Sequence, residues 1–424
     1  MLKSKFTVQS ESDSDNLQII DLPNHIKLIY DYVPSLKSFS LGISVMVGSR
    51  EDPLEKPGIA HFLEHQLFRR NLHRTSTQTS KEFERTGTIN NAFTESEYTV
   101  YFIKSLNNNF KKVFKLLADF FLCPVFDERD FKKEQKIILE EIKSYQDDPE
   151  ENIFDLGNSL AFSHHTLGNP IAGTVKSVSH FKQNDIYEFF KRYYSSDNIV
   201  ISYSGSHPIE FVRNFAFELF KDFSNHTSTQ VRTPLPNNTI DKLIINRKIE
   251  QSHILLLKRF DNIDSDFVLK LKLLNYILGE GPSSFINQNI REKQAISYSA
   301  FSLVEHFTDT NLIEIYFATD KKAISKTKDL LNEIFEKITN KKISKQLFAI
   351  SKNALLAQNI YKSESSYERM LNNIRLYQLD GNFEFDRDFQ KNLKAIDYAE
   401  FLDWASNIFA DNKFSEVQIL QNRI

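Results

Sequence analysis

Apolar and polar residues alternate at every second position in two stretches near the N-terminus, which predicts two half-buried strands. These stretches are HIKLIYDYV (25–33) and FSLGISVMV (39–47). Later segments with apolar residues three and four positions apart predict helices at 81–87, 109–121, 129–146 and 183–194. Two further strands are predicted by the alternation at 90–105 (NNAFTESEYTVYFIKS) and by NIVISYSG at 198–205.

The second half of the chain repeats this order of elements. Strands are predicted at 252–260 and 311–319, and helices at 267–279, 324–338 and 343–362. The segments 177–201 and 392–417 share a pattern, which indicates duplication of one α+β unit. We therefore expect a first domain at 1–223, a linker rich in Ser, Thr, Asn and Pro at 224–241, and a second domain at 242–424.

Composition narrows the classes of function. The chain has 424 residues, 41% of them hydrophobic, and a net charge of −3, so it has no global field that would gather nucleic acid or an anionic membrane. No window reaches the roughly 18 apolar residues of a membrane-spanning helix. The single cysteine, Cys123, forms no internal disulfide and fits a reducing compartment, so we expect a cytoplasmic protein.

The stretch HFLEH (61–65) carries the candidate chemistry. On a helix, His61 and His65 are four residues apart and project from one face, with Glu64 beside them. Two neutral imidazoles suit zinc, which needs a third protein ligand and one position for water, and Glu64 would act as general base. The alternative is that both histidines are ordinary polar residues on a half-buried helix.

A second segment, FKKEQKIILEEIKSYQDDP (131–149), supports the metal site. Glu134 and Glu141 are two helical turns apart and share a face, while Ile137, Ile138 and Ile142 form an apolar stripe. Glu141 can ligate the metal and Glu134 can accept a hydrogen bond from a ligand imidazole. The alternative is that both glutamates lie on a solvated face.

H-x-x-E-H is the inverted zincin signature, and the chain resembles the pitrilysin/insulinase family of zinc peptidases. It resembles most the short bacterial members that are similar to the mitochondrial processing peptidase. The resemblance rests on five stretches in order, namely PGIAHFLEHQLF, GTINNAFTESEYTVYF, EQKIILEEIKSYQDDP, HTLGNPIAG and LGEGPSSFINQNIREKQAISYS.

The resemblance implies roles for individual residues. His61, His65 and Glu141 would ligate one zinc ion per chain, Glu64 would be the general base, and Glu134 would support a ligand histidine. The segment Asn91, Ala92, Phe93 and Thr94 resembles the family's substrate-binding edge strand. Arg291 and Tyr298 resemble the pair that holds the substrate and the oxyanion.

The resemblance also implies a fold and an activity. The fold is α+β, with two homologous domains that each carry a mainly antiparallel sheet and helices packed on one face. The activity is zinc-dependent endopeptidase cleavage of oligopeptides or unfolded precursor and leader peptides inside a dimeric chamber, in the cytoplasm of a bacterium. The dimer is either a homodimer or a heterodimer with a related subunit.

Three alternatives stay open from the sequence. The chain could be the catalytic half of a heterodimer that processes one precursor, such as a bacteriocin. It could be a noncatalytic scaffold subunit of the same fold, although the complete set of ligands speaks against that. A zinc hydrolase that acts on a non-peptide is the third alternative.

Overall fold

The computed structural model describes residues 8–9, 17–223, 232–294, 296–297, 299–380 and 388–422. They form two compact units, each built on one β-sheet. Unit 1 comprises Met1–Lys143, Asn169–Pro234 and Lys362–Gly381, and unit 2 comprises Ser144–Gly168, Leu235–Tyr361 and Asn382–Ile424.

Unit 1 contains a seven-stranded sheet with the order β1-β2-β3-β7-β4-β6-β5. All neighbouring pairs are antiparallel except β3 and β7. The strands are β1 (Val8–Gln9), β2 (Leu17–Asp21), β3 (Lys27–Tyr32), β4 (Ser38–Val45), β5 (Ile89–Thr94), β6 (Thr99–Leu106) and β7 (Ile199–Gly205).

Unit 2 contains a five-stranded sheet with the order β10-β11-β9-β12-β8. Its one parallel pair is β12 and β8. The strands are β8 (Lys242–Arg247), β9 (Ser252–Phe260), β10 (Ala300–His306), β11 (Asn311–Thr319) and β12 (Ser415–Gln421). The run β8-β12-β9-β11-β10 repeats the pairings of β3-β7-β4-β6-β5, in agreement with the duplication predicted from the sequence.

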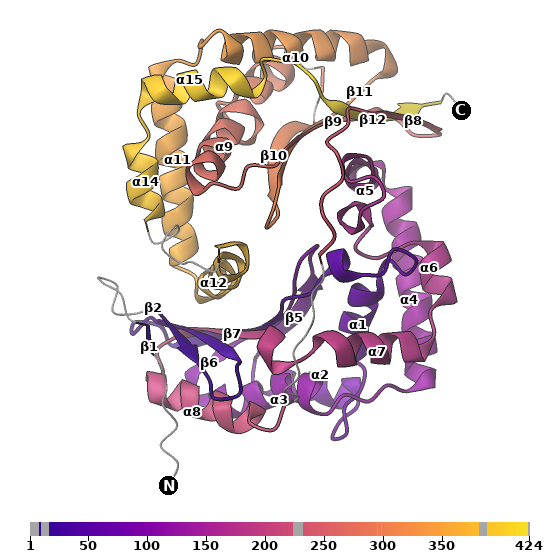
Figure 1. Ribbon diagram of the computed structural model, residues 1–424, viewed down its shortest axis with the longest axis vertical. Helices are drawn as coiled ribbons and strands as arrows, with labels where there is room; N and C mark the ends of the chain where they lie inside the picture. The colour runs from indigo at the N-terminus through magenta and orange to yellow at the C-terminus, as the bar shows by residue number, and fades with distance from the viewer. Residues whose placement is uncertain are drawn as a thin grey trace. The chain divides into compact units, whose positions relative to one another are not determined.

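Most helices of unit 1 cover one face of its sheet (Figure 1). They are α1 (Ile59–Leu67), α2 (Ser76–Arg85), α3 (Phe110–Leu122), α4 (Glu128–Asp147, mostly in this unit), α6 (Val175–His180), α7 (Gln183–Tyr193) and α8 (Ile209–Phe220). The alternation in β4 explains this layer, because Leu41, Ile43 and Val45 are fully buried in the core that these helices complete.

The opposite face of this sheet is covered by α12 (Ser366–Asp380). Small residues of β4 and β7 let the helix approach closely. The hydroxyl of Ser202 donates to the carbonyl of Met370 at 3.0 Å, and a Cβ on Gly42 would lie 2.5 Å from the sulfur of Met370.

Unit 2 has the same two-sided arrangement. One face of its sheet packs on the helices α9 (Ser265–Asn275), α10 (Ile324–Thr339), α11 (Lys345–Ser363, mostly in this unit), α14 (Phe389–Ala395) and α15 (Tyr398–Ile408), with the π-helical segments η5 (Tyr276–Glu280) and η6 (Asn287–Glu292). The other face packs on α5 (Pro149–Ala161) through Ile153. Leu255 and Leu257 of β9 face α5, whereas Ile254 and Leu256 face the larger helical layer.

The fold class predicted from the sequence is confirmed: both units are α+β with a mainly antiparallel sheet and a main helical layer on one face. Each sheet also carries one helix on its second face, which the sequence did not predict. Each compact unit contains segments from both of the predicted domains, 1–223 and 242–424. These two contiguous domains remain our proposal for the duplicated segments. Residues 224–231 of the proposed linker lie outside the described residues.

Two local predictions were wrong. The segment 90–105 forms two strands, β5 and β6, because residues 95–98 turn the chain back on itself. Ile137 is 46% exposed, because α4 buries the face of Phe131, Ile138 and Ile142, and each residue turns the helix by about 100°.

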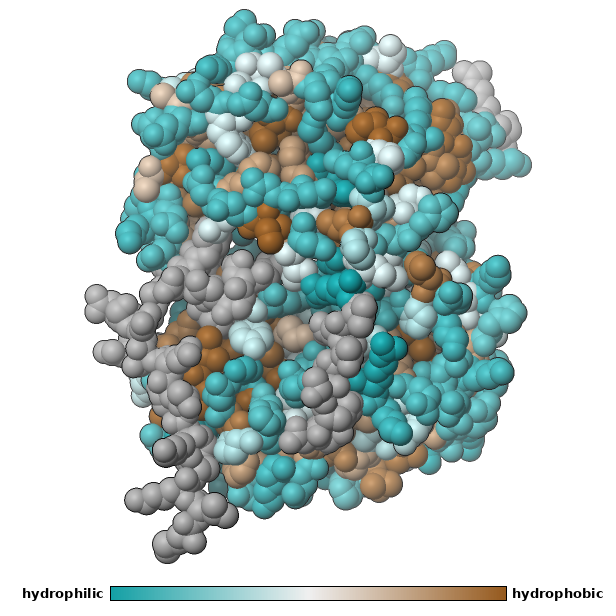
Figure 2. Space-filling model, in the orientation of Figure 1, coloured by the Kyte–Doolittle hydropathy of each residue, from teal (hydrophilic) through white to brown (hydrophobic). Residues whose placement is uncertain are grey.

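The molecular face drawn in Figure 2 is mainly hydrophilic, with apolar residues in small groups. Among the described residues, no helix is long and apolar enough to cross a membrane.

Candidate metal centre

The start of α1 is fixed by a glycine and a buried carboxylate. Gly58 has a φ of 94°, and a Cβ there would lie 2.6 Å from the carbonyl oxygen of Ala172, so the position requires glycine. The carboxylate of Asp52 accepts hydrogen bonds from the backbone N–H groups of Gly58 at 2.6 Å and Ala60 at 3.0 Å. These bonds satisfy donors that a helix start leaves unpaired, so the position of the helix is well defined.

The rotation of α1 is set by Phe62 and Leu63, which are fully buried in the core of unit 1. His61 and His65 therefore project together from another side of the helix, with ring centroids 4.6 Å apart. The predicted placement of both imidazoles on one face is correct.

The helix α4 brings Glu141 to the same point. One carboxylate oxygen of Glu141 lies 3.8 Å from Nε2 of His61, and the other lies 3.7 Å from Nε2 of His65. Ligand atoms of the three residues all lie within 4.8 Å of one another. Both distances are longer than a hydrogen bond, so two nitrogens and one carboxylate converge at the spacing that a shared cation would bridge.

Glu134, one turn of α4 away from Ile138, lies on the other side of His65. Its carboxylate is 2% exposed and accepts a hydrogen bond from Nδ1 of His65 at 3.1 Å. Arg69 forms an ion pair with the second oxygen of this carboxylate. The hydrogen on Nδ1 leaves the lone pair on Nε2, the atom that faces Glu141, which is the tautomer that a metal requires.

His61 has the protonation state of a ligand. Burial, and secondarily the neighbouring His65, lowers the pKa of His61 to about 3, so its ring is neutral near pH 7. Its Nδ1 is buried and has no hydrogen-bond partner among the described residues. Two imidazole nitrogens with one carboxylate match the donor set of zinc, so the residues fit this ion.

Glu64 lies beside the two histidines and is 7% exposed. The hydroxyl of Thr94 donates a hydrogen bond to Oε2 of Glu64 at 2.7 Å. Burial raises the pKa of Glu64, and the bond from Thr94 partly opposes that shift. A carboxylate whose pKa is raised toward neutrality is suited to take up a proton.

Comparison with known proteins decides the family. The model described as "Insulinase (Peptidase family M16)" matches residues 27–175, and "Peptidase M16 inactive domain" matches 180–355. A Rickettsia felis protein named "uncharacterized zinc protease" is 30% identical and aligns over 82% of this chain and 86% of its own length. The chain belongs to peptidase family M16.

Two further proteins are similar to this chain over most of its length. A Bacillus subtilis protein, also named an uncharacterized zinc protease, is 27% identical over 92% of this chain and 95% of its own length. The crystal structure of a Helicobacter pylori protease has the same fold, with a TM-score of 0.86 at 20% identity, and covers 95% of this chain and 99% of its own. The insulinase model spans both segments of the metal-ligand cluster, whereas the inactive-domain model covers most of unit 2.

The segment expected to bind substrate in an M16 peptidase forms β5, the edge strand of the sheet of unit 1. Asn91 is exposed, Ala92 is buried, and Phe93 packs on Tyr98. The side chain of Thr94 is buried and bound to Glu64, so it points to the candidate base rather than to solvent.

Of the predicted substrate pair, Arg291 is among the described residues. Arg291 is an exposed residue of η6 in unit 2. Tyr298 lies outside the described residues. The role of both residues stays a prediction.

Sequence reasoning missed Arg69 and Asp52. Arg69 follows His65 by four residues and so could have been placed on the same side of the chain, but it stands just beyond the helix. Asp52 is six residues before Gly58, and only the folded turn brings it to the start of α1. No sequence period indicates that contact.

A second group of metal-ligand residues, His73, Asp119 and Cys123, also lies within 4.8 Å. Asp119 is already paired with Arg74 at 2.6 Å. Burial and the nearby Asp119 raise the pKa of the Cys123 thiol, which keeps it protonated and a poor ligand. The group around His61 is therefore the better metal centre.

Proposed function

We propose that this M16 chain is a zinc-dependent endopeptidase that hydrolyses oligopeptides or unfolded precursor and leader peptides. The observation that carries the proposal is the convergence of His61, His65 and Glu141 around one point with Glu64 beside it. One zinc ion per chain would be held by these three ligands. When bound, it would polarise the scissile carbonyl and lower the pKa of the attacking water.

Four side chains near the proposed zinc ligands have separate roles. Glu64 takes the proton of the attacking water, and the hydroxyl of Thr94 fixes the direction of its carboxylate. Glu134 holds His65 in the tautomer that presents Nε2. Arg69 balances the charge of Glu134, which would otherwise be a buried carboxylate beside a neutral ring.

The substrate would bind in extended form along β5. An edge strand has main-chain groups on one side that can pair with an added peptide. Asn91 to Thr94 would lie along that peptide. The hydrogen bond from Thr94 to Glu64 would hold the strand at a fixed position relative to the general base. Arg291 and Tyr298 would donate hydrogen bonds to the oxyanion.

We further propose that two chains form the active chamber, in the cytoplasm of a bacterium. The single cysteine supports a reducing location. A chain that is dimeric and active when expressed alone would be a homodimeric oligopeptidase. A chain that binds zinc but cleaves nothing alone would be the catalytic half of a heterodimer that processes one precursor, and the mass by size exclusion separates the two cases.

The test is zinc content together with cleavage of a quenched-fluorescence peptide library, for the wild type and for Glu64→Gln. We expect one zinc per chain in both proteins, and cleavage by the wild type that falls by roughly 100-fold or more in the variant, because general-base catalysis contributes about that much. Residual activity near that of the wild type would remove Glu64 as the base. Absence of zinc from the wild type would support a scaffold subunit.

A further inference from the structure

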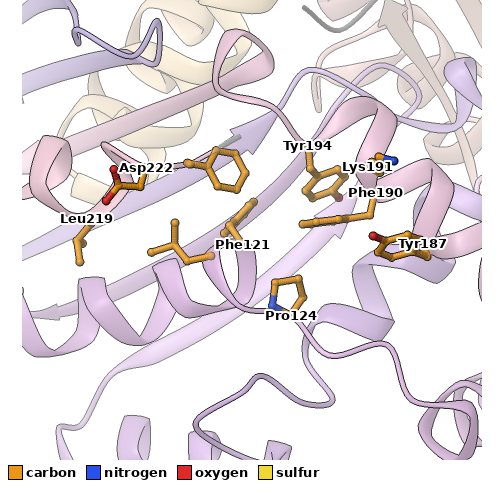
Figure 3. Close-up of a pocket in the computed structure, with 10 residues that line it drawn as sticks. Phe121, Pro124, Tyr187, Phe190, Lys191, Tyr194, Leu219 and Asp222 are labelled. Atoms are coloured by element: carbon orange, nitrogen blue, oxygen red, sulfur yellow. The ribbon is translucent and has the colours of Figure 1, made fainter. Parts of the chain in front are cut away.

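Two features of unit 1 lie outside the metal centre, and one of them connects to it. The pocket drawn in Figure 3 has a volume of about 410 Å³ and mainly aromatic walls. Its two charged residues, Lys191 and Asp222, lie at opposite ends of the row of aromatic side chains, so they do not converge on one ligand. The other feature is a group of buried charges around Arg232, which is joined to both segments that carry the proposed active site.

Arg232 belongs to the segment predicted as a linker, and its guanidinium contacts two carboxylates of unit 1. Its Nε donates a hydrogen bond to Oε1 of Glu51 at 3.4 Å, and its Nη1 lies 3.1 Å from Oε1 of Glu97. The side chains of both glutamates are 4% exposed, whereas that of Arg232 is 29% exposed. Because a buried carboxylate is unfavourable without a cation beside it, Arg232 stabilises both charges.

Glu51 connects Arg232 to the start of α1. It is the last residue of the short 3₁₀-helical turn η1 (Ser49–Glu51), and its Oε2 accepts a hydrogen bond at 2.9 Å from the backbone N–H of the residue before that turn. The next residue is Asp52, whose carboxylate binds the first N–H groups of α1. Since α1 carries the proposed base, Glu64, a displacement of Glu51 would be passed to the base.

Glu97 connects Arg232 to the proposed substrate strand. It lies in the turn between β5 and β6, and it also accepts a hydrogen bond from Nη1 of Arg50 in η1 at 2.6 Å. The backbone N–H groups of Ser49 and Arg50 donate to carbonyl groups of the same turn at 3.2 and 2.7 Å. The segment that starts α1 and the turn that follows β5 therefore form one hydrogen-bonded block.

The charges of this block are balanced. Two guanidinium groups, of Arg50 and Arg232, meet two carboxylates, of Glu51 and Glu97. Burial raises the pKa of Glu51 to about 7, and among the groups that oppose this shift Arg232 acts most strongly. Without Arg232, two buried carboxylates would share the charge of Arg50 alone and would repel each other.

We propose that Arg232 is a positioning residue of the proposed active site. Its guanidinium holds Glu51 and Glu97 together, and it thereby fixes the start of α1 relative to the end of β5, the strand expected to bind the peptide. Its effect on catalysis rests on the proposed peptidase function. The coupling between the two segments does not, and it can be measured without turnover.

The first test is hydrogen–deuterium exchange of the full-length, metal-free chain at pH 8, for the wild type and for Arg232→Gln. Backbone N–H groups of residues 49–60 and 89–98 should exchange roughly tenfold faster in the variant, because a hydrogen bond to a charged group contributes about that factor. The other strands and helices of unit 1 should keep their rates. Arg85→Gln, which removes an exposed ion pair with Glu82, is the matched control and should alter neither segment.

The second test is steady-state cleavage, at pH 8, of a quenched-fluorescence peptide that the wild type cleaves. In Arg232→Gln the zinc content should stay at one per chain while kcat falls roughly 10- to 100-fold, because small displacements of reacting groups have effects of about that size. Arg232→Lys should lie between the two, since an ammonium group keeps the charge but lacks the fork that reaches two carboxylates.

A double variant separates positioning from a general loss of stability. Adding Glu51→Gln to Arg232→Gln should restore most of the lost kcat, because a neutral amide still accepts the backbone hydrogen bond but needs no cation beside it. A residue that only stabilises the fold would show no such recovery.

Three results would overturn the proposal. Unchanged exchange at residues 49–60 and 89–98 would mean that Arg232 does not hold these segments. Faster exchange throughout unit 1 would make Arg232 a general stabiliser of the fold. A fall in kcat that Glu51→Gln does not reverse would place the cause outside this group of charges. A wild type that cleaves no peptide would bear on the proposed function alone, and the exchange rates would still decide the role of Arg232.

Discussion

The helices that follow the central strands β4 and β9 hold corresponding places in units with the same strand pairings, but they bury different residues. In unit 1, α1 buries His61 and Glu64. In unit 2, α9 buries Leu269, Leu271, Leu273 and Leu274. Leucine fills this place in the fold without any polar group, so the histidines and glutamate of α1 are not required for folding. Their burial costs stability, and the cost is explained if they serve chemistry.

The difference between α1 and α9 is tested first by loss of the proposed third ligand, Glu141, for which we expect the largest effect on zinc affinity. Glu141→Gln removes the carboxylate charge that closes the cluster, so zinc affinity should fall by more than the roughly 10–100-fold typical of outer-shell changes. Competition with a chromogenic chelator measures it. Glu140→Gln is the matched control, because Glu140 projects to solvent and pairs with Lys143 at 2.6 Å. Equal loss in both variants would remove Glu141 from the site.

The second effect concerns the partner of His65. Glu134→Gln keeps the shape of the side chain but weakens the acceptor for Nδ1, and zinc affinity should fall roughly 10–100-fold. The same competition assay measures the change. Glu128 is exposed in the first turn of α4, so Glu128→Gln should leave the affinity unchanged. An unchanged affinity in Glu134→Gln would mean that the tautomer of His65 is set in another way.

The third effect tests whether a buried carboxylate without a partner behaves differently from those of the metal centre. Glu314 on β11 is 1% exposed, and neither of its oxygens has a hydrogen-bond partner in the described structure. Burial, and secondarily Glu305, raises the pKa of Glu314 well above its ordinary value. The folded chain therefore holds this proton where the unfolded chain releases it, so the proton stabilises the fold at low pH and the effect is lost as pH rises.

Glu314→Gln should remove that dependence. The variant should gain thermal stability relative to the wild type as pH rises above the ordinary glutamate pKa of about 4.3, by on the order of 1–3 kcal/mol near pH 8. Thermal unfolding at a series of pH values measures it. Glu333→Gln, exposed on α10, should show the pH dependence of the wild type. Parallel curves for Glu314→Gln and the wild type would refute the account.

The smallest effect concerns the helices on the second faces of the sheets. The helix α12 lies close to its sheet because the strand residues beneath it are small. The helix α5 lies close to its sheet because it carries Gly157, where a Cβ would lie 2.6 Å from Cδ2 of Leu255. Gly157→Ala should lower the free energy of unfolding by about 1 kcal/mol, because overpacking outweighs the gain in helix propensity. Chemical denaturation measures it. Adding Leu255→Val should recover part of the loss, and simple additivity of the two changes would contradict the contact.

The sequence predicted those parts of the molecule that depend on local period. Strands, most helices and the shared face of His61 and His65 follow from spacings along one element. The proposed metal-ligand set rests on the spacing within two helices together with the resemblance to the M16 family. The packing of α5 and α12 on the second faces of the sheets could not be predicted. The spacing of apolar residues along a helix does not identify the sheet on which the helix packs. Arg69 and Asp52 were missed for a related reason, since their contacts depend on how chain segments meet after folding.

The most direct test of the central claim is the X-ray absorption spectrum of the zinc-loaded wild-type chain. The account predicts one zinc ion with scattering from two imidazole rings and from carboxylate oxygen, and without sulfur. Sulfur scattering would place the ion at Cys123, the single cysteine of the chain, and a single imidazole would break the pairing of His61 with His65. Either result would contradict the assignment of the metal centre to α1 and α4.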